Sequence, residues 1–221
     1  VVLRRLERFG VETVELGAQS MDNRVLELSG RGHSAEDVEN ASRLIKAAGF
    51  GLVLQMMTGL PGDTPESAVM TAKRIIALKP DGVRIYPTVI VRDTELCDMW
   101  CSGRYTEHTV EDAVSYCARI VPLFEEAGIA IIRMGLNPTE DLSGGDALGG
   151  AYHPAMGELV YSRLMRDRAE ELLEQAPAGS RIVLGVNPCD LSKAIGQHRG
   201  NIEYLKAKYK LKELRIKACD T

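Results

Sequence analysis

The strongest constraint on this fold is that short apolar runs alternate with longer segments of helical periodicity. The runs have the length and apolar character of buried strands, and each is followed by a helical pattern. Strand starts recur at a spacing of roughly 30 to 45 residues, which is typical of β–α units around a parallel sheet. The candidate strands are residues 13–18, 51–58, 82–88 and 129–135.

Helix signals between these strands are clear. Ser34 is a good N-cap for a helix over residues 35–48, and Asp37 occupies its N3 position. Thr64 precedes Pro65, which is well tolerated at the first position of a helix because its missing N–H has no partner there. We expect the buried stripe of this second helix to contain Val69, Ala72, Ile75 and Ile76.

A third helix is expected over residues 109–127, where Pro122 predicts a kink or a break. Four parallel strands with their helices suffice for only part of a (β/α) barrel, so the fold class is α/β and residues 1–150 are assigned to a partial barrel. An open half barrel has two unpaired edges, so we expect the other strands to come from a missing N-terminal half or from another chain. The absence of an initiator methionine favours the first source.

Residues 151–221 are predicted to form a small α+β domain. A loop rich in Gly, Asp and Ser over residues 138–150 precedes a long helix over 154–175. Its expected apolar face contains Leu159, Val160, Leu164, Leu172 and Leu173. The elements expected after it are a strand at 181–186, short helices at 191–195 and 201–209, and a strand at 213–217.

The composition excludes several classes of protein. Hydrophobic residues form 45% and charged residues 26% of the 221-residue chain, which fits a globular protein. No apolar run approaches the roughly 18 residues of a membrane span. The five cysteines are odd in number and scattered, so we expect a reducing cytoplasm and no disulfide framework. Residues 190–221 carry eight Lys/Arg against four Asp/Glu, so a basic tail follows a body with 19 against 27.

Polar and small residues follow the first strands, at the edge where barrels of this kind carry their chemistry. Gln19 and Ser20 offer neutral donors and acceptors suited to ribose hydroxyls, and Gly17 allows a ligand to approach the backbone. The alternative is that these are ordinary loop residues.

Segments 17–20, 31–33, 55–63, 84–96 and 100–105 together resemble the radical S-adenosylmethionine enzymes. The resemblance is strongest to the group containing the catalytic subunit of the Elongator complex and weaker to oxygen-independent coproporphyrinogen oxidases. It covers about residues 10–135, and its motifs occur in the right order at barrel spacing.

The resemblance implies a [4Fe–4S] cluster and reductive cleavage of S-adenosylmethionine. By position, Gln19 and Ser20 face the ribose and Arg31 faces the methionine carboxylate. The remaining cofactor residues implied in this way are Gln55, Met57 and Tyr86. The alternative for Arg31 and His33 is a solvated turn before the Ser34 cap.

One departure from the family is decisive for activity. The run of three cysteines that ligates the cluster is absent from the sequence. Cys97 and Cys101 are four residues apart, but Arg104 stands where the third thiol belongs, and two thiols do not replace three. We therefore expect Cys97, Cys101 and Cys117 to be small, partly buried residues, the cluster ligands to lie outside this chain, and the chain to be inactive alone. There is also no room for an acetyltransferase domain.

Residues 191–202 look like the helix–loop–helix of a KH domain, whose GXXG loop clamps a nucleic-acid backbone. Arg199 stands at the second glycine of that motif, and Gly200 comes one place late. The predicted RNA contacts are Lys193, Gly196, Arg199 and Lys206. Alternatively, the lysines from 206 to 212 form a solvated face. Tyr152 and His153 are interpreted as a helix-entry segment held by packing; the alternative is that they lie near a substrate as a hydrogen donor or acid.

We therefore predict the C-terminal part of a bacterial, cytoplasmic radical S-adenosylmethionine enzyme with no membrane partner, acting on an unidentified substrate such as a tRNA. One alternative is a nucleic-acid-binding module with a non-catalytic barrel scaffold. Another is a non-radical barrel enzyme assembled by dimerisation.

Overall fold

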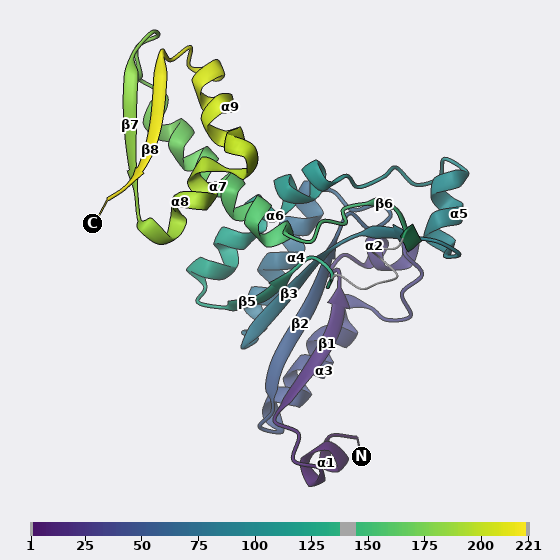
Figure 1. The fold of residues 1–221 in the computed structure, drawn as a ribbon. Coiled ribbons are helices and arrows are strands. Elements are labelled where there is room, and N and C mark those ends of the chain that lie inside the picture. The colour runs from purple at the N-terminus through teal and green to yellow at the C-terminus, as the bar shows by residue number, and fades with distance from the viewer. Residues whose placement is uncertain (1, 138–144, 220–221) are drawn as a thin grey trace. The chain divides into compact units, whose positions relative to one another are not determined.

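The computed structural model describes residues 2–137 and 145–219 (Figure 1). Contacts divide the chain into two compact units, Val1–Pro154 and Ala155–Thr221. The division falls a few residues beyond the boundary expected at residue 150. No helix in the described ranges is long and apolar enough to cross a membrane.

The first unit is built on a parallel sheet with strand order β1-β2-β3-β5. These strands are β1 (Thr13–Gln19), β2 (Gly51–Thr58), β3 (Gly82–Pro87) and β5 (Ala130–Met134). All four predicted strands are therefore confirmed, together with the α/β class. The helices are α1 (Val2–Arg8), α2 (Asn23–Leu28), α3 (Ala35–Ala47), α4 (Pro65–Ala77), α5 (Glu95–Cys101) and α6 (Val110–Glu126).

A second, antiparallel pair of strands was not expected from the sequence. β4 (Val89–Val91) pairs with β6 (Ala147–Gly150), inside the segment predicted as a loop. Residues 138–144 of that predicted loop lie outside the described residues. The pairing joins segments far apart in the sequence, and glycine-rich β6 carries no strand periodicity that would have indicated it.

Helix starts follow the local signals. Ser34 and Asp37 form the capping box of α3, and Thr64 caps α4 with Pro65 in the first turn. The buried face of α4 differs from the prediction: it consists of Ala68, Thr71, Ala72 and Ile75, while Val69 and Ile76 are half-buried. The small residues face inward because α4 packs against both β2 and α6.

The expected break at Pro122 does not occur. α6 continues through this proline to Glu126. Five residues of α6 are buried, four before the proline and one after it: Ala113, Cys117, Ile120, Val121 and Phe124. Packing of one continuous face therefore outweighs the loss of a single backbone hydrogen bond.

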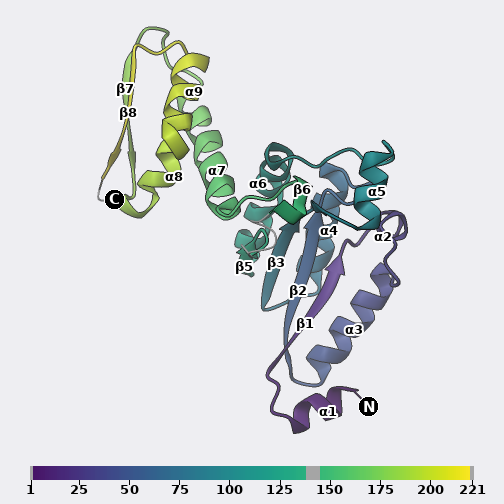
Figure 2. The same ribbon diagram turned by 45° about the vertical axis from the view of Figure 1, so that its right-hand side comes forward.

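The two faces of the sheet differ in character. Along β2, Leu52, Leu54 and Met56 are fully buried, on the face that contacts α3, α4 and α6 (Figure 2). The opposite face carries Gln55 and Met57, which are partly exposed. We call this second side the open face, and the same alternation on β1 and β3 makes it polar.

The second unit contains α7 (Met156–Leu173), β7 (Arg181–Val186), α8 (Leu191–Ile195), α9 (Gly200–Lys208) and β8 (Glu213–Ala218), with short 3-10 helices at Pro188–Asp190 and Gln197–Arg199. β7 and β8 pair in parallel. The core is Ala169, Leu173, Ile202, Leu205, Leu211 and Leu214. Leu172, expected on the apolar face, is 70% exposed because the following residue, Leu173, takes the inward position.

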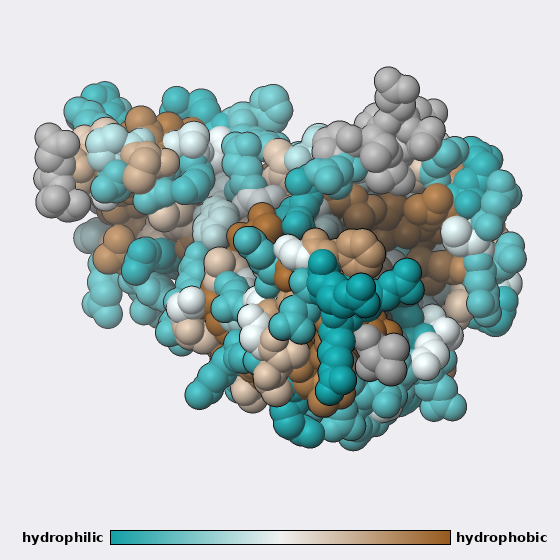
Figure 3. All heavy atoms as spheres, turned by 90° about the horizontal axis from the view of Figure 1, so that it is seen from below, coloured by the Kyte–Doolittle hydropathy of each residue, from teal (hydrophilic) through white to brown (hydrophobic). Residues whose placement is uncertain are grey.

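Hydrophilic side chains cover most of the surface visible in Figure 3, and apolar side chains gather around a hollow in the larger unit. Small-molecule sites are commonly hollows of this kind, lined mainly by apolar side chains with a few polar groups.

Candidate functional site

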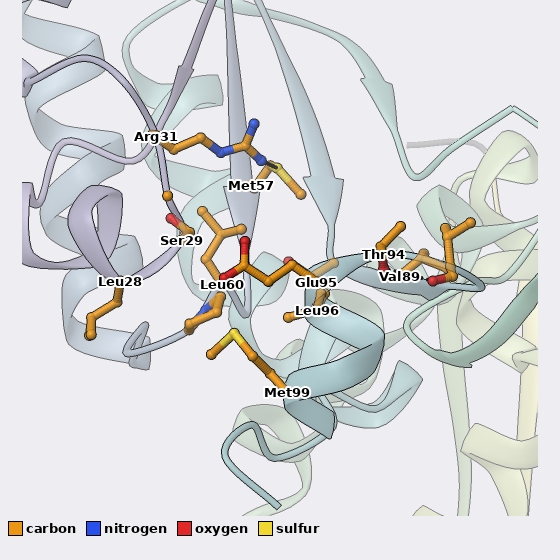
Figure 4. A pocket seen from close by; sticks show the side chains of 14 residues that line it. Leu28, Ser29, Arg31, Met57, Leu60, Val89, Thr94, Glu95, Leu96 and Met99 are labelled. Atoms are coloured by element: carbon orange, nitrogen blue, oxygen red, sulfur yellow. Dashed lines mark hydrogen bonds between the residues drawn. The ribbon is translucent and has the colours of Figure 1, made fainter. Parts of the chain in front are cut away.

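A cavity of about 220 Å³ lies beyond the carboxyl ends of the sheet strands. Its walls come from the turn between α2 and α3, the end of β2, and the segment from β3 to α5. They include Arg31, Met57, Leu60, Val89, Glu95 and Met99 (Figure 4). The lining is mainly apolar with a few charged groups at its edge, as in ordinary small-molecule sites.

Arg31 brings a positive charge to this cavity. Its side chain is exposed, and its Nη2 lies 3.4 Å from the Met57 sulfur. Figure 4 shows the guanidinium beside Met57, while Glu95 extends from the start of α5 towards Leu60. The turn behind Arg31 is anchored, since His33 Nε2 is 3.2 Å from the Ala18 carbonyl oxygen. An exposed guanidinium on an anchored turn is available to an anionic ligand.

Gln19 is held in an unusual backbone conformation at the end of β1. Its φ is 61°, and the register of β1 against β2 shifts between Gly17 and Gln19. The shift turns the Gln19 amide over Gly17, where an added Cβ would lie 2.5 Å from Nε2. Strained residues and bulges of this kind cluster at functional sites. A side chain at position 17 would therefore displace the Gln19 amide from this position.

Ser20, the other predicted ribose contact, points into the core. It is 3% exposed and shares a hydroxyl hydrogen bond of 3.3 Å with Thr71. Its oxygen also accepts from the Asp22 backbone N–H at 3.1 Å. The structure thus uses Ser20 to fix the start of α2 and does not bring it to the cavity.

The open face carries a polar network that includes Gln55. Its Nε2 donates to Glu15 Oε1 at 2.6 Å, and Arg84 Nε forms a 2.7 Å ion pair with the same carboxylate. Tyr86 is half-buried and pairs in register with Met57. Gln19, Gln55 and Tyr86 do not line the cavity, whereas Met57 lines it and belongs to the same strand face.

Glu15 and Arg84 were not predicted as site residues from the sequence. Their signal was the alternation of side chains along a strand, which places Glu15 with Gly17 and Arg84 with Tyr86 on one face.

The loop after β2 is held by buried polar groups that were also missed. Tyr105 donates its hydroxyl hydrogen to the Gly59 carbonyl at 2.6 Å, and Asp63 Oδ2 accepts from the Gly59 N–H at 2.8 Å. His108 Nε2 lies 3.2 Å from the Thr58 hydroxyl. These contacts fix the loop that presents Leu60 to the cavity.

Burial shifts the pKa of three titratable groups around this loop. It raises the pKa of Tyr105 to about 12, raises the pKa of Asp63, and lowers the pKa of His108. At neutral pH, Tyr105 and His108 are therefore uncharged.

The cysteines do not fit an iron–sulfur cluster. Across the described residues there is no group of three Cys, His, Asp or Glu side chains that could hold a metal. Burial, the neighbouring Cys101 thiol, Asp98 and Asp93 raise the pKa of Cys97, which disfavours the thiolate needed for ligation. Cys117 is buried, but Cys101, the last residue of α5, is exposed, contrary to the expectation.

The predicted nucleic-acid contacts lie in different environments. Lys193 Nζ pairs with Asp190 at 2.7 Å. Gly196 has a φ of 75° and packs against Asn201, and Lys206 is half-buried. Arg199 is exposed and left-handed, with a φ of 63°. The loop therefore presents Arg199 to solvent more fully than the other three.

Comparisons with known proteins agree with this architecture. The family model of the radical SAM superfamily matches residues 1–75, and that of the Radical_SAM C-terminal domain matches residues 80–166. The chain is 32% identical over 165 residues to a tRNA uridine(34) acetyltransferase of Methanocaldococcus jannaschii, covering 72% of this chain and 29% of that protein. It is 35% identical over 118 residues to Elongator complex protein 3 of Homo sapiens, covering 52% and 22%.

A solved structure is similar as well. The Elp3 of Methanocaldococcus infernus, with an N-terminal deletion of residues 1–46, matches with a TM-score of 0.65 and 29% identity, covering 76% of this chain and 38% of that one. The chain thus spans less than a third of the length of the curated relatives it matches. From the sheet, its site and these matches, the chain belongs to the radical SAM superfamily, whose cofactors are S-adenosylmethionine and a [4Fe–4S] cluster.

Proposed function

We propose that this chain forms the S-adenosylmethionine-binding part of an enzyme that modifies RNA. The observation that carries the proposal is the cavity at the carboxyl ends of parallel strands, where Arg31 lies beside Met57. Gln19 is turned towards the open face at the same end of the sheet by a strained bulge. These donors suit a small molecule with a carboxylate and a ribose.

Each residue has a defined task in this proposal. Arg31 binds the methionine carboxylate through its guanidinium fork, and the Gln19 amide binds ribose hydroxyls. Leu60 and Met99 exclude water from the apolar part of the cavity. S-adenosylmethionine bound beside a reduced [4Fe–4S] cluster would supply radical chemistry there, with the cluster providing the electron.

We infer that the cluster ligands come from polypeptide outside these 221 residues. The inference is supported by the lack of a three-ligand group in the described ranges and by the share of the relatives that the chain covers. β1 is also an edge strand of the four-stranded sheet, so its outer side is a place where a further strand could pair.

We further propose that the RNA is a tRNA and that the second unit contacts it. Support comes from the archaeal relatives, which are named tRNA uridine(34) acetyltransferases, and from the exposed Arg199 in a basic tail. Acetyl transfer, which those names also state, is not part of the proposal for these residues.

The test is calorimetric binding of S-adenosylmethionine to the 221-residue chain. Arg31→Ala should weaken binding by about tenfold or more, because a charged hydrogen bond contributes roughly 1.5 to 3 kcal/mol. Gln19→Ala should weaken it less, since the lost bond is neutral. The matched control is Arg24→Ala, which removes an exposed arginine from α2 and should leave affinity unchanged.

Unchanged affinity in both site variants would remove these residues from the site. No binding by the wild type, together with retained RNA binding, would favour the nucleic-acid-binding module with a non-catalytic scaffold.

A further inference from the structure

We propose that Arg84 and Arg133 form a binding site for a monoanionic oxyanion, a carboxylate or a phosphodiester, on the open face of the sheet. The site is distinct from the cavity that contains Arg31, and it does not depend on S-adenosylmethionine being bound. Its occupant would be an anionic group of the substrate.

A bulge between β3 and β5 brings the two arginines together. Val83 pairs with Ile131, but the next pair is Arg84 with Arg133, so Ile132 is the extra residue. In a regular register Ile132 would lie opposite Arg84. In the bulge, Ile132 and Arg133 of β5 together oppose the single residue Arg84 of β3.

The strand register places Arg133 on the open face. Ile132 lies against the open side of Gly82, where an added Cβ would be 2.6 Å from its Cδ1. Met134 pairs with Ile85, which is fully buried on the helix-covered face. Arg133 is the register partner of Arg84, and paired residues of neighbouring strands point to the same face, so Ile132 and Arg133 both lie on the open side.

The charges on this face are not balanced. Glu15 is paired with Arg84 at 2.7 Å. Arg133 donates from Nε to the Gly135 carbonyl at 2.9 Å and from Nη2 to the Leu136 carbonyl at 3.4 Å, and both acceptors are neutral. Among the described residues, the group thus has two guanidinium ions and one paired carboxylate. Like charges at paired positions of neighbouring strands repel each other. One bound monoanion would neutralise the excess positive charge.

Donors remain available for such a ligand. The Arg84 side chain is 29% exposed, and its contact with Glu15 lacks the in-line geometry of a hydrogen bond although the atoms are close. A guanidinium has five N–H groups, and these two arginines use few of them. Paired guanidinium groups match the planar oxygens of a carboxylate or a phosphodiester better than they match a halide.

The location indicates which part of a substrate would bind. Arg84 precedes Tyr86 by two residues, which is about 7 Å along a strand, and Tyr86 pairs with Met57 at the edge of the cavity. An anion held by Arg84 and Arg133 therefore lies deeper along the open face than a ligand in the cavity. A substrate anchored there would present its other end towards the cavity.

The experiment is an NMR titration of the Arg Nε–H resonances of the 221-residue chain at constant ionic strength. Propionate and dimethyl phosphate are the two probes, and they separate a carboxylate source from a phosphodiester source. Each is compared with added chloride. We expect saturable shifts of the Arg84 and Arg133 signals with at least one oxyanion and weaker shifts with chloride.

Variants test the charge argument in both directions. Arg84→Gln and Arg133→Gln should each weaken oxyanion binding about tenfold. Glu15→Gln should strengthen it, because it raises the positive excess. Arg43→Gln, an exposed position on α3, is the matched control and should have no effect. Arg31→Ala should also have no effect, which keeps this site separate from the proposed S-adenosylmethionine site.

Loss of binding in the arginine variants with tighter binding in Glu15→Gln would support the site. Equal affinity in the wild type and both Arg→Gln variants, or chloride binding as strong as oxyanion binding, would overturn it.

Discussion

At the scale of single residues, the positive-φ side chains mark the places where this chain departs from ordinary backbone geometry. Gln19 and Arg199 are both of this kind, and each lies at a proposed ligand contact. A non-glycine residue in this region costs roughly 1 to 2 kcal/mol, which surrounding structure must offset. The strain is therefore a testable property of each position.

Arg199→Gly should stabilise the chain. Glycine adopts a φ of 63° without a Cβ clash, so the expected gain is about 1 kcal/mol, reduced by the greater entropy of the unfolded glycine. Urea unfolding followed by circular dichroism measures it. Gln197→Gly is the matched control, since Gln197 has no positive φ and gains only the unfavourable entropy. Equal destabilisation by both substitutions would contradict the strain argument.

At the scale of elements, the loop after β2 connects a buried polar cluster to the cavity. Gly59 has a φ of 76°, and a Cβ added there would lie 2.0 Å from the His108 ring. His108 also meets Tyr116 edge-on, with ring centroids 4.9 Å apart. Rigid packing behind the loop is what places Leu60 and Pro61 in the cavity wall.

Gly59→Ala should therefore be strongly destabilising, by about 3 kcal/mol or more, because backbone strain adds to a clash with a packed ring. Gly62→Ala provides a close comparison. Gly62 has a φ of 80°, but its added Cβ would meet only the tip of the exposed Leu28 side chain. Its expected cost is about 1 to 2 kcal/mol, from strain alone. Thermal unfolding of both variants measures the two losses of stability. Equal losses would show that the clash with His108 adds nothing to the cost of Gly59→Ala.

The buried His108 makes stability depend on pH. Burial lowers the pKa of His108 in the folded state, so the unfolded chain binds the proton more readily. Stability is then complete above the unfolded value of about 6.5 and falls as the pH drops below it. The raised pKa of Asp63 acts in the opposite direction. Urea unfolding between pH 7.5 and 5.5 should show a decrease that His108→Asn removes; a flat wild-type profile would be inconsistent with a buried neutral imidazole.

At the scale of the whole molecule, the chain divides its proposed tasks between two units and lacks a cluster site in its described parts. The sheet of the first unit offers donors to a small ligand, and the second unit offers exposed cations. Each unit has buried hydrophobic residues of its own.

We expect the 221-residue chain to bind no stoichiometric iron–sulfur cluster after anaerobic reconstitution. Cys97 and Cys101 lack a third ligand, and the surroundings of Cys97 disfavour its thiolate. Iron and sulfide analysis after desalting measures this. Cys97→Ser provides the control, since a retained cluster in the wild type and its loss in the variant would show that the α5 thiols do ligate iron.

RNA binding by the chain should be weak and dependent on salt. Lys193 is engaged with Asp190, so we expect about two phosphate contacts, from Arg199 and Lys206, and a slope near −1.4 in log affinity against log salt. Arg199→Gln should flatten the slope by about 0.7, and Lys193→Gln should leave it unchanged. Fluorescence anisotropy with a labelled tRNA measures the slopes. A salt-independent affinity would exclude a phosphate-based interface.

Local sequence determined the elements of this protein. Caps such as Ser34 and Thr64, and runs such as residues 51–58, predicted the helix starts and the strands, because these signals act within about one turn of helix or a few strand positions. The residue types around Arg31 likewise indicated the cofactor class through a family resemblance.

Tertiary structure alone decided which side chains share a surface. The bulge that sets Arg133 beside Arg84, the inward turn of Ser20 and the pairing of β4 with β6 all depend on partners distant in the sequence. A one-residue change of register moves a side chain to the other face of a strand while leaving the local pattern unchanged, so no short window of sequence contains that information.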